Sequence, residues 1–153
     1  MAKRFTESGK WEDPWFRKLP MASKMLWSWL HDKCDAAGIL NPDFDLAGFQ
    51  IGTKITKEDL DVFEDRVIWL DNGFLWVVNF VREQYGVLSP DCRPHKAVIS
   101  ILEHNGIDLE RAEKGCSKGI NTLKDKDKDT VQDQDQDKTK TSKRLNKAES
   151  TEQ

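Results

Sequence analysis

The sequence lacks the features that mark several common classes of protein. It contains no apolar run near the roughly 20 residues that a membrane helix needs, and its basic start leads into Trp and Asp-Pro rather than into the apolar segment of a signal peptide. Its three cysteines, Cys34, Cys92 and Cys116, are widely spaced and form no C-x-x-C pair. These absences exclude a disulfide framework and a zinc ribbon. They predict a protein of the reducing cytoplasm that is neither exported nor anchored.

The motifs of several enzyme classes are also missing. No Gly-rich phosphate loop, nucleophile elbow or H-E-x-x-H run occurs. His31, Cys34 and Asp35 could share one helix face as metal ligands, but no fourth ligand has suitable spacing, so we interpret them as core or surface residues. The sequence therefore predicts a protein that works by binding rather than catalysis, without a cofactor or a metal.

Apolar residues are scarce and unevenly placed. They make up 37% of the chain against about 45–50% in globular proteins, whereas charged residues make up 33% against about 25%. All six Trp, all seven Phe and the one Tyr lie between Phe5 and Tyr85. We therefore expect one packed domain over residues 1–110, followed by a disordered charged tail over residues 111–153. The low-complexity repeat KDKDKDTVQDQDQDK, residues 124–138, lies in this tail.

Helical spacing is clearest between residues 20 and 35. Six apolar side chains recur there at i, i+3, i+4 and i+7, namely Ala22, Met25, Leu26, Trp29, Leu30 and Cys34. Trp27 lies off this stripe, so we expect it either to cover a second element or to be partly exposed. Asp13-Pro14 predicts a short helical turn just before this helix, because Asp caps helices and Pro suits the first helical position.

Two further helices are predicted between residues 39 and 66. After a single rung of strand at residues 39–40, a helix should run from residue 41 to Ile51, with Gly52 at its C-terminal cap. Its expected buried residues are Leu46, Ala47, Phe49 or Gln50, and Ile51. A capping-box pattern at Thr56 to Asp59 then predicts a third helix ending near Asp65.

The remaining pattern predicts a hairpin and a last helix. Two β-branched and aromatic runs, residues 67–70 and 74–81, are joined through Asn72-Gly73, which favours a type I′ turn. A helix should follow over residues 94–104, burying Val98, Ile99 and Leu102. We expect the fragment from residue 109 to residue 113 to be frayed.

This order of elements indicates an α+β, mostly helical fold: a winged helix-turn-helix with one additional C-terminal helix. Several motifs between Arg4 and Gly106 then carry a family resemblance. They are Lys10-Trp11, Trp15-Phe16-Arg17-Lys18-Leu19, Leu26-Trp27, Cys34-Asp35-x-Ala37-Gly38, Asp45-Leu46-Ala47 with Phe49-x-Ile51-Gly52, Asn72-Gly73, Phe80-Val81-x-x-Gln84-Tyr85-Gly86, and His95-Lys96-x-Val98-Ile99. This stretch, about two-thirds of the chain, resembles the N-terminal domain of phage replication proteins, called replisome organisers or replication initiators.

The resemblance implies a DNA-binding protein that acts in the initiation of phage or prophage DNA replication. It implies that the domain binds origin DNA in the bacterial cytoplasm, while a C-terminal segment recruits a replicative helicase or its loader. This chain departs from the pattern after the repeat, because residues 139–153 are too few and too polar for a packed recruiting domain. Three readings stay open: a short relative, a truncation, or recruitment through a peptide.

The charge distribution selects candidate DNA contacts. Residues 1–110 carry 13 Lys and Arg against 18 Asp and Glu, yet the first 24 residues carry six against three. Such a local basic patch can hold a polyanion although the whole domain is acidic. We expect Arg17, Lys18 and Lys24 near the first helix, and Lys54 and Lys57 ahead of the third, to contact DNA.

The predicted third helix argues against the usual mode of readout. It carries five acids, Glu58, Asp59, Asp61, Glu64 and Asp65, and the wing tip Asp71-Asn72-Gly73 has no Lys or Arg. The alternative is a protein-interaction winged helix or a small transcription regulator, in which this acidic helix faces a partner protein. Among the tryptophans, only Trp11 and Trp27 look free enough to stack on the bases of a single strand, and a core role is the simpler reading for the rest.

Overall fold

The computed structural model describes residues 3–116, all within one compact unit. The expected disordered tail lies outside these residues from position 117 onward. The described part is an α+β fold, mostly helical, with a small antiparallel sheet. Its three strands are β1 (Ile39–Leu40), β2 (Val67–Trp69) and β3 (Leu75–Val77), in the order β1-β3-β2. Trp76 in the central strand lies opposite Ile39 on one side and Ile68 on the other.

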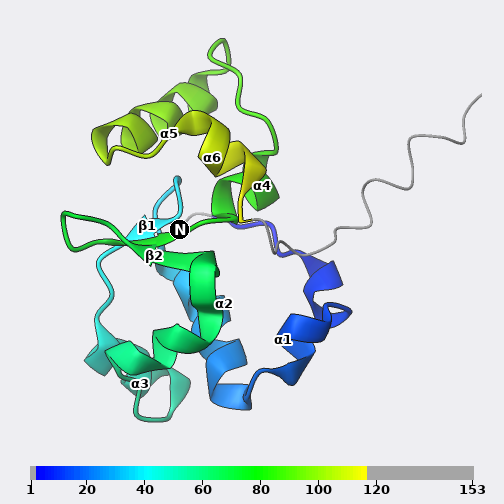
Figure 1. Ribbon diagram of the computed structural model, residues 1–153, viewed down its shortest axis with the longest axis vertical. Helices are drawn as coiled ribbons and strands as arrows, with labels where there is room; N and C mark the ends of the chain where they lie inside the picture. The colour runs from blue at the N-terminus through cyan, green and yellow to red at the C-terminus, as the bar shows by residue number, and fades with distance from the viewer. Residues whose placement is uncertain (1–2, 117–153) are drawn as a thin grey trace, which may run out of the picture. The chain divides into compact units, whose positions relative to one another are not determined.

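Helices cover both faces of this sheet. Because side chains alternate along a strand, Leu75 and Val77 join one buried cluster while Trp76 joins a second. The first cluster is completed by helix α1 (Pro14–Lys18), helix α2 (Met21–Lys33), helix α3 (Phe44–Ile51) and the 3₁₀ segment η2 (Lys57–Arg66). The second is completed by helices α4 (Phe80–Tyr85), α5 (Arg93–His104) and α6 (Leu109–Lys114). Figure 1 shows α5 and α6 above the sheet and α3 below it.

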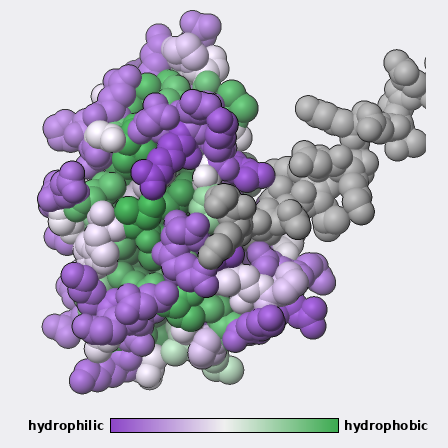
Figure 2. All heavy atoms as spheres, viewed as in Figure 1, coloured by the Kyte–Doolittle hydropathy of each residue, from purple (hydrophilic) through white to green (hydrophobic). Residues whose placement is uncertain are grey.

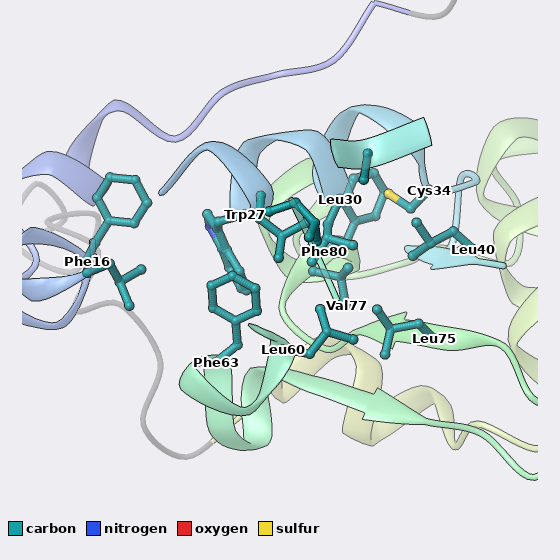
Figure 3. Close-up of a cluster of buried hydrophobic side chains, with 14 residues drawn as sticks. Phe16, Trp27, Leu30, Cys34, Leu40, Leu60, Phe63, Leu75, Val77 and Phe80 are labelled. Carbon is teal, nitrogen blue, oxygen red and sulfur yellow. The ribbon is translucent and has the colours of Figure 1, made fainter. Parts of the chain in front are cut away.

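Helix α2 confirms the most regular pattern in the sequence. Leu26, Leu30 and the capping residue Cys34 are buried, as the stripe predicts, whereas Met25 is half exposed. Trp27, which lies off the stripe, is only 3% exposed. Its ring centroid lies 5.2 Å from the ring centroids of both Trp15 and Phe63, so it covers two other elements. Figure 3 shows Trp27 between α2 and the Phe63 ring of η2, which removes it as a stacking platform.

The bounds of α3 follow the prediction, but the expected burial does not. Asp43 caps the helix by accepting a hydrogen bond from the Leu46 amide (2.9 Å), and Gly52 ends it at φ 85°. Ala47 is buried, whereas Leu46 is exposed and Phe49 is 85% exposed. The expectation failed because the helix is short and meets α2 through one narrow face, on which Phe44, Ala47 and Ile51 lie at i, i+3 and i+7.

The predicted third helix is not an α-helix. The capping box of Thr56 and Asp59 is present, but it opens a 3₁₀ segment, η2, which is kinked at Glu64 (φ 52°). Carboxylates recur in this segment at i, i+3 and i+4, as at Asp61 and Asp65, and like charges at those spacings destabilise an α-helix. Leu60 and Phe63 are buried as predicted, so the segment keeps its apolar face without regular helical geometry.

The hairpin is present with a different turn. Leu70 and Phe74 close a three-residue loop through a 2.8 Å hydrogen bond from the Leu70 amide to the Phe74 carbonyl. Gly73 has φ 82°, but Asn72 does not have the positive φ that a type I′ turn requires. Asn72 is held instead by its side chain, which accepts from the Phe74 amide and donates to Asn105 (2.7 Å). The prediction of a two-residue type I′ turn was therefore wrong.

The expected second strand also ends earlier than predicted, because the chain turns at Val78 and Asn79 into helix α4. Gly38 makes this turn possible. Its carbonyl accepts a hydrogen bond from the Val77 amide (2.8 Å), and its φ of 82° suits glycine. A Cβ at position 38 would lie 2.6 Å from the Phe80 Cβ, so β1 and the start of α4 approach one another at van der Waals contact.

The C-terminal helices extend the packed region to Cys116. Helix α5 buries Val98 and Leu102 as predicted, whereas Ile99 is half-buried. Helix α6 is not frayed, because Asp108 caps it at the Arg111 amide (3.1 Å). Ala112 and Cys116, both beyond residue 110, are buried in the second cluster. The side chain of the buried Asn79 accepts a 2.7 Å hydrogen bond from the Cys116 amide, which fastens the end of α6 to α4.

Candidate nucleic-acid interface

Two lysine side chains converge on one buried ring near the N-terminus. The ammonium of Lys10, in the 3₁₀ segment η1 (Ser8–Trp11), lies 5.7 Å from the centroid of the Phe16 ring, and that of Lys24 lies 6.0 Å from the same centroid. The Lys24 ammonium also donates to the Arg17 carbonyl (3.0 Å). Together with the exposed Arg17 and Lys18, these residues form what we call the Phe16 cation cluster: Lys10, Arg17, Lys18 and Lys24.

Local structure explains how the chain positions this cluster. Asp13 caps α1 by accepting from the Trp15 amide (2.8 Å), and Pro14 occupies the first helical turn. Phe16 is then fully buried beneath α2, while Arg17 and Lys18 end the helix, where cations suit its negative terminus. Hydrophilic side chains gather over α1 in the view of Figure 2.

Two of the three acids in the same stretch of chain already accept hydrogen bonds from backbone amides. Within residues 3–116, none of its four cations forms an ion pair with a carboxylate. Glu7 accepts from the Gly9 amide (3.1 Å), and Asp13 is engaged as a helix cap. Glu12 is exposed and is the nearest remaining acid in the sequence. The cations therefore stay available to an external anion.

Trp11 adds an aromatic surface beside these cations. Its ring meets the Phe16 ring edge to face, with centroids 5.1 Å apart, and the residue is 57% exposed. The sequence placed Arg17, Lys18 and Lys24 in the interface but omitted Lys10. The signal for Lys10 was its place in the basic stretch before residue 24, and what the sequence could not supply was its position over Phe16.

The other two predicted contacts lie in a different setting. The Lys57 ammonium lies over the Trp69 ring, 4.7 Å from its centroid, and Lys54 is exposed in the loop after α3. No hydrogen bond or ion pair among the described residues joins this pair to the Phe16 cation cluster. The structure thus brings Arg17 and Lys24 together and leaves Lys54 and Lys57 in a second group.

That second group borders an acidic surface. All five acids of η2 are exposed: Glu58, Asp59, Asp61, Glu64 and Asp65. Hydrogen bonds from its own backbone N–H and from the Thr56 hydroxyl lower the pKa of Glu58, so its carboxylate is charged at neutral pH. A polyanion placed along η2 would be repelled, which makes this segment a poor recognition helix.

Sequence reasoning missed a pocket near α2 and the N-terminal segment of Arg4 and Phe5 beside it, which we call the strap. Arg4 donates from one guanidinium to the carbonyls of Cys34 and Asp35, and Gln84 exchanges two hydrogen bonds with the backbone of Phe5. A pocket of about 120 Å³ lies under this strap, lined partly by Lys10, Asp32 and Glu83. Cations and carboxylates both line it, so it favours no ligand of a single charge.

His31 and Glu83 form a half-buried pair in this pocket. His31 Nε2 lies 3.3 Å from the Glu83 carboxylate, and Nδ1 lies 2.9 Å from the Trp27 carbonyl. The pair ties α2 to α4, and its sequence spacing gave no signal for it.

The arrangement of His31, Cys34 and Asp35 does not form a metal centre. Across residues 3–116, no group of three or more His, Cys, Asp or Glu side chains is placed to hold a metal ion. The Cys34 thiol donates to the His31 carbonyl (3.3 Å), and burial raises its pKa to about 12. It is therefore a protonated core thiol rather than a thiolate ligand.

Comparisons with known proteins leave this interface to be judged on its own chemistry. No family model, no curated protein and no solved structure matches the chain. Among the described helices, none is both long and apolar enough to cross a membrane.

Proposed function

We propose that residues 3–116 bind DNA through the Phe16 cation cluster and act in the initiation of phage or prophage DNA replication. The observation that carries the DNA-binding part is the cluster itself: four cations on one short stretch of chain, two of them over one ring, with no ion-pair partner in the described residues. Phosphates are the natural counterions of such a surface.

The order of elements supports a winged-helix framework for this proposal. Helix α2, strand β1, helix α3, segment η2 and the β2–β3 hairpin follow one another in the order of such a domain, with the 3₁₀ segment η2 in the place of its third helix, and α5 supplies the additional helix. The replication role rests on the resemblance to replisome organisers, and the motifs that carry this resemblance all lie within the described residues. A helicase or helicase loader is the partner that this role implies.

The number of cations sets the expected strength. About four phosphate contacts would give a log–log slope of affinity against salt near −3.6. Binding of one copy would then be weak at physiological salt, and additional contacts from Lys54 and Lys57 or from a second copy would strengthen it.

Fluorescence anisotropy of labelled duplexes tests the proposal. The full chain is titrated onto fragments of its own genome at several salt concentrations, beside a Lys10→Gln/Arg17→Gln/Lys24→Gln variant. We expect a steep salt dependence whose slope becomes shallower by about 2.7 in the variant, because three phosphate contacts are lost. A flat salt response in the unaltered protein would overturn the proposal.

The acidic surface of η2 favours a second candidate function, a protein-interaction domain or small transcription regulator. Five exposed carboxylates beside the exposed Val62 form a surface that suits a basic partner protein better than DNA. Reversing Lys54 and Lys57 to Glu separates the two functions. Binding to DNA should weaken, whereas binding to a basic partner should not.

A further inference from the structure

Trp11 stands out among the exposed aromatic residues because its ring contacts Phe16, the same ring on which two lysines lie. It is 57% exposed, and it leans on the buried Phe16 ring at a centroid distance of 5.1 Å. Lys10 and Lys24 lie over that same ring, at 5.7 and 6.0 Å. The indole thus packs against a fully buried ring.

The other tryptophans offer no such surface. Trp27 and Trp76 are buried, and Trp15 and Trp29 are partly covered by the first core cluster. Trp69 is partly exposed, but its ring lies under the Lys57 ammonium and beside the acids of η2. Within residues 3–116, Trp11 is therefore the exposed indole that has no cation over its own ring and that shares an aromatic contact with two lysines.

This combination has a defined ligand chemistry. A nucleobase presents a flat face that stacks on an indole, and its phosphates need cations a few ångströms to the side. In a duplex both faces of each base are already covered by neighbouring pairs, so the surface of Trp11 gains a partner when a base is unpaired. Phosphate contacts alone would not need an aromatic residue at this position.

We propose that Trp11 and the Phe16 cation cluster form a site for single-stranded DNA, with an unpaired base stacked on Trp11 and its flanking phosphates held by Lys10, Arg17 and Lys24. This inference rests on the proposed function, since it uses the same cations, and it specifies the strand state that they select. The domain would then hold a melted segment in preference to a closed duplex.

The test compares three ligands on the full chain at about 50 mM salt, where phosphate contacts are strong. They are an oligothymidylate of about 12 nucleotides, the same strand with abasic sugars in its centre, and a duplex of equal length. We expect the intact strand to bind about tenfold or more tightly than the abasic strand, because stacking is lost when the bases are removed.

Three variants test whether the preference for the intact strand depends on the Trp11 ring. Trp11→Ala should bind the intact and the abasic strand equally, whereas Trp11→Phe should keep most of the preference, since phenylalanine also stacks. Phe49→Ala removes an exposed aromatic residue on α3 and should leave the preference unchanged. Equal binding of intact and abasic strands by the unaltered protein, or a preference that survives Trp11→Ala, would overturn this inference.

The design separates this inference from the function on which it rests. If the duplex binds in a salt-dependent way but the intact and abasic strands bind equally, the proposed function stands and the stacking site is ruled out. Absence of binding to all three ligands removes both.

Discussion

The Phe16 cation cluster and the segment η2 border the same buried core but present opposite charges to the outside. Phe16 and Phe63 belong to one cluster, and Trp27 contacts Phe63 on one side and Trp15 of α1 on the other. On this shared core, the Phe16 cation cluster presents four cations and η2 presents five acids. The core therefore fixes where both surfaces lie, whereas the exposed residues alone decide which of them meets an anion.

The largest expected effect comes from removing a buried residue that contacts both regions. Trp27→Ala should lower the free energy of unfolding by about 3–5 kcal/mol, because it leaves a cavity between Trp15 and Phe63. Urea denaturation measures this change. Trp11→Ala is the matched control and should cost much less, since Trp11 is mostly exposed. A loss below about 1 kcal/mol for Trp27→Ala would mean that the two regions are supported independently.

The next effect compares the two sets of cations directly. Lys10→Glu/Arg17→Glu/Lys24→Glu should weaken duplex binding by about two orders of magnitude at low salt. Lys54→Glu/Lys57→Glu should weaken it by about one, because fewer phosphate contacts are lost and the acids of η2 already repel phosphate. Anisotropy titrations at one salt concentration measure both variants. The reverse ranking would place the interface along η2.

A smaller effect is expected when the acidic surface is neutralised. Asp61→Asn/Asp65→Asn should raise duplex affinity by no more than about threefold, because salt screens the repulsion between exposed charges, with a Debye length of about 10 Å at 0.1 M. Both residues are exposed, so the fold should not change. A tenfold increase in affinity would show instead that the duplex lies against η2 and that its carboxylates limit binding.

The smallest expected effect is the alkylation of the Cys34 thiol. Its protection also reports whether each of these variants is folded. Because burial raises its pKa to about 12, the thiol should resist alkylation at pH 8, while the partly exposed Cys92 reacts. Peptide mass spectrometry after iodoacetamide treatment measures both sites. Rapid native-state labelling of Cys34 would contradict its burial, and labelling confined to one variant would show that this variant is unfolded.

The same thiol predicts a direction for stability in alkali. Between the ordinary pKa of 9.0 and the folded value of about 12, the unfolded chain loses the Cys34 proton while the folded chain keeps it. The unfolded state then binds fewer protons, so the stability that Cys34 contributes is complete below pH 9 and is lost as the pH rises towards 12. Cys34→Ser should flatten this part of a pH titration of stability.

The elements were largely predictable because their signals are local. The spacing in α2, the Asp13-Pro14 cap of α1 and the Gly52 end of α3 each depend on neighbouring residues, and each is present in the structure. Local signals failed where tertiary contacts decide. Asn72 avoids positive φ because its side chain is held by Asn105, which lies 33 residues away.

The candidate site was predictable in part for the same reason. The basic stretch before residue 24 is visible in the sequence, but the position of Lys10 over Phe16 depends on how η1 folds back onto α1. The five acids of η2 were equally visible, whereas their 3₁₀ geometry was not. The pair of His31 and Glu83 spans 52 positions and left no pattern to detect.

The close approach at Gly38 joins strand β1 to the start of helix α4, where the two core clusters adjoin. Phe80 belongs to the first core cluster and its neighbour Val81 to the second, and a side chain at position 38 would push on Phe80 and on the Val77 carbonyl. We expect the two clusters to depend on one another through α4, so that unfolding of residues 3–116 proceeds in a single transition. The Phe16 cation cluster would then lose its support only when the whole of residues 3–116 unfolds.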